Sequence, residues 1–213
     1  MRALWQRIER VLEQRWPNKR LELRPPASAR QVEEAESQLG VRFPEDFRES
    51  LRVHDGQDGE PELLWLPGVH KLGSLESMVR CWQEDRRFFE AEDRECFAWL
   101  DHSQRVRQVH AHPQHISFAG SSFWDYDRLL FDFDPAPLGK AGQIIVRFDC
   151  ELVFLCESWR ELMEKTAEGL ENGRITLDEC GPELSHQVRP SYLSPKCARN
   201  LSFFDYYASA WPL

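Results

Sequence analysis

The stretch RLLFDFDPAPLGKAGQIIVRFDCELVFLC, residues 128–156, decides the class of fold. Three apolar runs in it have the composition typical of strands, namely residues 128–133, 143–148 and 151–156. Only residues 149–150 separate the last two runs, so we expect a tight hairpin there. HISFAG, residues 115–120, predicts one more strand just upstream. Consecutive short strands of this kind predict an antiparallel sheet.

Helical periodicity surrounds these strands. Apolar residues recur at helical spacing in five segments, namely residues 4–16, 28–39, 44–51, 75–89 and 158–172. Two capping boxes are expected at helix starts, Ser28 with Gln31 and Ser158 with Glu161. Gly40 is placed to end a helix in the left-handed conformation, and Pro44 suits the first position of the next helix. Together the segments predict an α+β fold, a central antiparallel sheet with helices packed on one side and at its ends.

The chain of 213 residues is long enough for one substantial domain. We expect a helical extension over residues 1–25 and an α+β domain over residues 26–180. Residues 181–213 form a tail rich in aromatic side chains, which we expect to pack on the domain or on a partner. Short strands are also predicted at 63–66 and 174–177.

The charge is unevenly distributed. The chain carries a net charge of −9, with +4 over residues 1–24 and −14 over residues 25–180. An acidic body of this kind argues against nucleic acid as a partner and favours a basic protein. No apolar run is long enough to span a membrane, and the first residues do not resemble a signal peptide, which predicts a cytoplasmic protein. The six cysteines show no metal-binding spacing, so we expect reduced thiols that pack as small apolar side chains.

Acidic and aromatic residues alternate around residues 124–134. If the strand is regular, Asp132 and Asp134 lie on one side of it, and Phe131 and Phe133 lie on the other. Three interpretations stay open: Asp134 caps the Asp-Pro turn while the other carboxylates face solvent, the group forms a partner-binding surface, or it binds a metal or acts in catalysis. Aromatic anchors beside charges suit a protein interface. The predicted partner-binding residues are Trp65, Trp124, Asp125, Tyr126, Asp127, Asp132 and Asp134.

Four histidines lie within fourteen positions, at His102, His110, His112 and His115. Histidine is a common ligand of transition metals, but this spacing matches no known helix or hairpin metal site. We therefore expect histidines of a loop or the core. The sequence predicts no catalytic residue, no metal and no cofactor.

Three blocks in order resemble the SUKH superfamily of the Smi/Knr type. The first block, residues 26–56, has a capped helix, a Leu-Gly end and a second helix led by Pro. It closes with Asp55–Gly56 where the family usually has Asn-Gly. The other two blocks are the Asp-rich strand with its Gly-Gln re-entry, residues 125–145, and the closing helix, residues 156–173. The Trp-x-Pro that the family commonly has ahead of the central strands is absent, and residues 110–113 read His-Ala-His-Pro instead.

The resemblance implies a binding module that is not an enzyme. Bacterial members of the family are implied to be immunity proteins that neutralise toxins, many of them nucleases, and fungal relatives regulate synthesis of cell-wall glucan. The leading hypothesis is therefore a bacterial immunity protein that binds a basic toxin domain. The alternatives are a regulatory or scaffold protein with several partners and a metal-dependent enzyme that uses the histidines and Asp132.

Overall fold

The computed structural model describes residues 1–15, 17, 22–58, 71–89, 103–109, 111–120, 128–148 and 151–172. In these ranges the helices are α1 (Arg2–Arg15), α2 (Ala29–Leu39), α3 (Glu45–Leu51), α4 (Leu75–Phe89) and α5 (Trp159–Asn172). The strands are β1 (Lys71–Leu72), β2 (His115–Gly120), β3 (Arg128–Asp132), β4 (Gln143–Phe148) and β5 (Glu151–Cys156).

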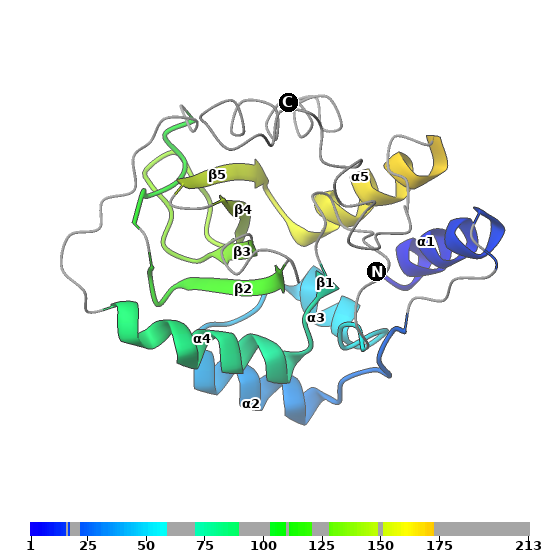
Figure 1. Ribbon diagram of the computed structural model, residues 1–213, viewed down its shortest axis with the longest axis horizontal. Coiled ribbons are helices and arrows are strands. Elements are labelled where there is room, and N and C mark those ends of the chain that lie inside the picture. The colour runs from blue at the N-terminus through cyan, green and yellow to red at the C-terminus, as the bar shows by residue number, and fades with distance from the viewer. Residues whose placement is uncertain are drawn as a thin grey trace, which may run out of the picture.

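The five strands form one antiparallel sheet in the order of the chain, β1-β2-β3-β4-β5. Helix α4 runs along β2 with α2 on its outer side, while α1 and α5 lie side by side (Figure 1). The α+β class with a central antiparallel sheet is confirmed. The hairpin expected around residues 149–150 is confirmed by the pairing of β4 with β5.

Both faces of the sheet are covered. Leu129 and Phe131 of β3 face the main core under the helices. Leu130 between them belongs to a second cluster on the opposite face, where Val106 packs on it. This alternation follows the two-residue period of a strand. The segment 103–109 therefore packs, through Val106, on the face of the sheet opposite the main core.

An aromatic cluster fills the centre of the main core. Phe47 of α3 contacts Phe131 of β3 and Trp159 of α5, with ring centroids 4.7 and 4.9 Å apart. Phe118 of β2 lies 4.6 Å from Phe131. All four side chains are almost completely buried, so two helices and two strands depend on one set of contacts.

Helix α1 is part of the same core. Trp5 and Ile8 have no exposed surface, and the Trp5 indole N–H donates to Ser50 Oγ of α3 over 2.7 Å. On its other side Arg7 pairs with Glu171 of α5. The division into an extension of 1–25, a domain of 26–180 and a tail of 181–213 stays a prediction, and the tail lies outside the described residues.

The helix ends follow the predicted chemistry, with two small differences. Ser28 and Gln31 form the full capping box of α2, and Gly40 ends it with a φ of +68°. Ser158 Oγ accepts the Glu161 N–H as expected, but the Glu161 carboxylate accepts the N–H of Glu157, so the second box is only half formed. Pro44 is the residue before the first of α3, one position earlier than predicted.

Asp55 and Gly56 connect α3 to the start of α4. Asp55 Oδ1 accepts the Leu75 N–H over 2.8 Å and so caps α4 from a distant part of the chain. An Asn side chain also offers an oxygen at this place, which explains why Asp can stand where the family usually has Asn. Gly56 has a φ of +81°, and a Cβ there would lie 2.5 Å from the Ser74 nitrogen, so only Gly fits.

Two predicted strands, 63–66 and 174–177, lie outside the described residues. Among the helices of the described ranges, none combines the length and the apolar character needed to cross a membrane.

Candidate functional site

A buried polar cluster joins the ends of β3 and β4. Asp132, the last residue of β3, has no exposed surface. Its Oδ2 accepts a hydrogen bond of 2.9 Å from Gln143 Nε2, and its Oδ1 accepts one of 3.0 Å from the Asp134 N–H. Asp132 and Gln143 are paired in the sheet register, so the hairpin places the two side chains together. We call the Asp132–Gln143 pair, with the Arg105 carbonyl it holds, the clasp.

Gln143 uses its whole amide group. Nε2 donates a second hydrogen bond of 2.9 Å to the carbonyl of Arg105, and Oε1 accepts the Lys140 N–H over 3.1 Å. The Arg105 carbonyl also accepts the N–H of Ala136. The clasp therefore ties three separate pieces of chain together: the segment 103–109, the end of β3 and the loop 133–142. We call this last segment the clasped loop.

The clasped loop lies close to the neighbouring segment. A Cβ at Gly139 would collide with the Arg105 carbonyl, so the backbone can approach only because Gly stands there. Gly142, with a φ of +84°, donates its N–H to the Asp132 carbonyl over 2.7 Å. These contacts hold the loop in one conformation on the clasp.

Two histidines flank the clasp. His115 of β2 is buried, and its Nε2 lies 3.5 Å from Asp132 Oδ1, too far for a good hydrogen bond. His112 Nε2 lies 3.5 Å from Asp134 Oδ2, and its Nδ1 accepts the Gln114 N–H. Burial lowers the pKa of His112, and the nearby His115 lowers it further, against the attraction of Asp134. His112 therefore resists protonation in the folded state.

The structure changes the interpretation of the two aspartates. Asp132 does not face solvent, as one interpretation expected, because the segment 103–109 covers that face of the sheet. Asp132, rather than Asp134, accepts the backbone N–H that closes the Asp-Pro turn. Asp134 is half-buried and lies 3.5 Å from Arg107 Nε. Only Asp134 of the two can reach a partner in this state.

The other predicted partner-binding residues, Trp65, Trp124, Asp125, Tyr126 and Asp127, lie outside the described residues. Their role stays a prediction. His102 and His110 also lie outside, whereas His112 and His115 contact each other with ring centroids 5.2 Å apart. In the part of the chain that the structure describes, no three His, Cys, Asp or Glu side chains converge as a metal site requires.

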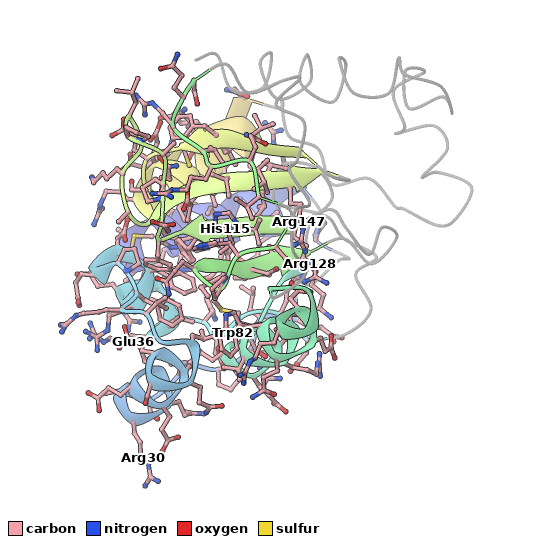
Figure 2. The ribbon with its side chains drawn as sticks, turned by 90° about the vertical axis from the view of Figure 1, so that its left-hand side faces the viewer. Arg30, Glu36, Trp82, His115, Arg128 and Arg147 are labelled. Atoms are coloured by element: carbon pink, nitrogen blue, oxygen red, sulfur yellow. The ribbon has the colours of Figure 1, made fainter. Side chains whose placement is uncertain are left out.

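A second polar group fastens α4 to the sheet. Asp85 of α4 lies 2.8 Å from Arg128 of β3 and 3.6 Å from Arg147 of β4. The two arginines are paired in the register and lie side by side, whereas Arg30 of α2 points away from the body (Figure 2). A shared carboxylate offsets the repulsion between two like charges on neighbouring strands.

Gln143 and Arg105 were not predicted from the sequence as site residues. Gln143 had only a partial signal: it opens the strand that follows the one carrying Asp132, and the register that pairs the two residues comes from the structure. Arg105 contributes a backbone carbonyl, and no residue type encodes such a contact. It could be found only from the fold.

Comparison with known proteins gives the family. The family model described as SMI1 / KNR4 family (SUKH-1) matches residues 26–165. The chain belongs to this family. The resemblance drawn from the three sequence blocks is confirmed, and the matched range includes the clasp and the clasped loop.

Three curated relatives of fungal origin match most of this chain. The "Glucan synthesis regulatory protein" of Neurospora crassa is 27% identical over 88% of this chain and 43% of its own length. The "Cell wall biosynthesis/cell cycle regulator smi1" of Schizosaccharomyces pombe is 28% identical over 82% of this chain and 37% of its own length. The "Cell wall assembly regulator SMI1" of Saccharomyces cerevisiae is 23% identical over 81% and 41%. The chain thus spans about two fifths of each relative's length.

These names describe regulators. They agree with the sequence-based alternative of a regulatory or scaffold protein better than with the leading hypothesis of a bacterial immunity protein.

Proposed function

We propose that this chain is a non-catalytic regulatory module of the cytoplasm that acts by binding other proteins. The observation that carries the proposal is the match to relatives named as regulators over more than four fifths of this chain. Regulation without chemistry requires a surface that holds partners, and the family domain, residues 26–165, makes up most of this chain.

The arrangement of the polar cluster supports a role of this kind. Both carboxylate oxygens of Asp132 accept hydrogen bonds from the protein itself, and Gln143 uses both amide atoms in the same way. A general acid or base needs a position from which it can reach the substrate. Asp132 has no exposed surface, and its contacts stabilise the loop on which surface residues are presented.

Quantitative binding tests the proposal. The chain is tagged, crosslinked in cells of its source and purified, and each retained protein is then produced alone and titrated against the purified chain. We expect saturable binding of at least one regulatory or biosynthetic protein with a Kd of about 1 μM or tighter.

Two outcomes would contradict the proposal. One is that no retained protein binds once purified. The other is that the chain binds a toxin encoded beside its gene and restores growth to cells that produce it, because that result would favour the immunity hypothesis.

A further inference from the structure

The clasped loop, residues 133–142, presents an apolar side chain to solvent. Leu138 is 63% exposed, the largest value for a large apolar side chain in the described part of the chain. Val109, at 37%, is the other large apolar side chain that is exposed there, and it lies in the segment that the clasp joins to the loop. A single exposed leucine is ordinary on a protein surface. The structure around this one is what makes it informative.

Rigid support distinguishes Leu138. The clasp, the close approach of Gly139 to Arg105 and the hydrogen bond from the Gly139 N–H to the Ala136 carbonyl fix the backbone on both sides of it. Pro137 precedes it and has a fixed φ. A rigid loop loses little conformational entropy when it binds, so its contacts yield more affinity than those of a flexible loop.

Two positive charges accompany the exposed leucine. Arg107 is held through its Nε, which donates to the Pro135 carbonyl over 3.3 Å and lies 3.5 Å from Asp134. Its two terminal nitrogens donate no hydrogen bond to the described residues, and neither does the ammonium of Lys140, which is exposed. An arginine fixed in this way offers a planar pair of donors that suits a carboxylate.

This local charge is opposite to that of the whole chain, which carries −9. At physiological ionic strength charges act over about 8 Å, so the side chains next to the contact decide which partner is favoured there. In the clasped loop and the segment 103–109 taken together, Asp134 carries the single carboxylate, whereas Arg107 and Lys140 each carry a positive charge.

We propose that the clasped loop binds an acidic protein partner, with Leu138 in an apolar socket and Arg107 and Lys140 paired with carboxylates at its rim. The inference rests on the proposed function and gives it a surface and a partner chemistry. It differs from the basic partner expected from the overall charge.

A random-peptide display library, panned on the purified chain, tests the inference and does not require the natural partner. Selected peptides are synthesised, and their affinity is measured for the unmodified chain and for variants. We expect peptides that combine Asp or Glu with large apolar residues. Leu138→Ala should weaken them about tenfold, as for a central interface residue, while Leu138→Met should retain most of the affinity.

Charge reversal provides the second arm. The double variant Arg107→Glu/Lys140→Glu should bind the selected peptides much more weakly, and any binding that is left should no longer weaken as salt is added. The matched control is Arg30→Glu, at a side chain that is 87% exposed on α2, and it should bind as the unmodified chain does. All the substituted side chains are exposed, and the double variant loses only the surface contacts of Arg107 with Pro135 and Asp134, so melting temperatures should fall little.

Three results would overturn the inference. They are no enrichment of peptides, enrichment of basic peptides, or selected peptides that bind the Leu138→Ala variant and the double variant as tightly as the unmodified chain. Each leaves the proposed function standing if the cellular partners still bind. Loss of all cellular partners would instead overturn the proposed function.

Discussion

Replacement of Asp132 by Asn tests the clasp with the smallest change in shape. Asn keeps one oxygen for the Asp134 N–H but places an NH₂ where Oδ2 accepts from Gln143 Nε2. Rotation of the Gln143 amide would not relieve the clash, because it would break the bonds to the Arg105 carbonyl and the Lys140 N–H. Two donors would therefore face each other in a site with no exposed surface.

The expected cost follows from these contacts. The loss of a hydrogen bond to a charged group costs about 1.5–3 kcal/mol, and a buried donor left without an acceptor adds to it. We expect Asp132→Asn to lower the free energy of unfolding by about 2–4 kcal/mol, a large part of the total for a typical domain. With a urea m-value of about 2 kcal/mol/M, the midpoint should fall by about 1–2 M at unchanged slope.

Asp134→Asn is the matched control. Asp134 is 37% exposed, and its pairs with Arg107 and His112 are both 3.5 Å long, so solvent screens them. The control should cost less than about 1 kcal/mol. Urea unfolding followed by tryptophan fluorescence measures both variants. If Asp132→Asn costs no more than Asp134→Asn, the clasp does not hold the loop and the reasoning fails.

Three further predictions concern other parts of the fold. Gly56→Ala should destabilise the protein by about 2–4 kcal/mol in thermal unfolding, because its φ of +81° is unfavourable for Ala and the new Cβ meets the Ser74 backbone at 2.5 Å; a cost below about 1 kcal/mol would refute this. Trp5→Phe should lower the free energy of unfolding in urea by about 1–2 kcal/mol, because the hydrogen bond to Ser50 is lost. The double variant Trp5→Phe/Ser50→Ala should be little less stable than Trp5→Phe alone, whereas a loss equal to the sum of the two single losses would show that the residues are not coupled. Folding lowers the pKa of His112, so the unfolded state takes up the proton first as pH falls. The free energy of unfolding should therefore fall as pH falls through about 6.5 and should stop falling below the folded pKa. His112→Asn should flatten this dependence between about pH 8 and about pH 5, and an unchanged slope would contradict the prediction.

The sheet and its helices could be predicted from the sequence because local signals agree with the fold. The runs over 115–156 have strand composition, and their short connections leave an antiparallel order as the natural one. Ser28 and Gly40 mark the two ends of α2 through bonds to their own neighbourhood. Local sequence patterns such as these predict the helix ends correctly because tertiary packing does not oppose them.

The polar cluster could not be predicted, because it depends on packing between distant segments. The alternation of Phe and Asp in β3 indicates which side chains share a side of the strand, but the exposure of Asp132 depends on what covers the sheet. Its cover includes Val106, in a stretch with no clear periodicity. The collision that excludes any residue except Gly at 56 likewise involves the backbone at Ser74, eighteen positions away.

Hydrogen exchange of the purified chain, with and without a partner identified in cells, tests the central claim most directly. The claim is that the chain acts by holding a protein through a loop that the clasp keeps rigid. The account predicts that bound partner slows exchange of the backbone amides in 133–142 and 103–109, and that Leu138→Ala removes this protection. Protection confined to other parts of the chain, or none at a saturating concentration of partner, would contradict it.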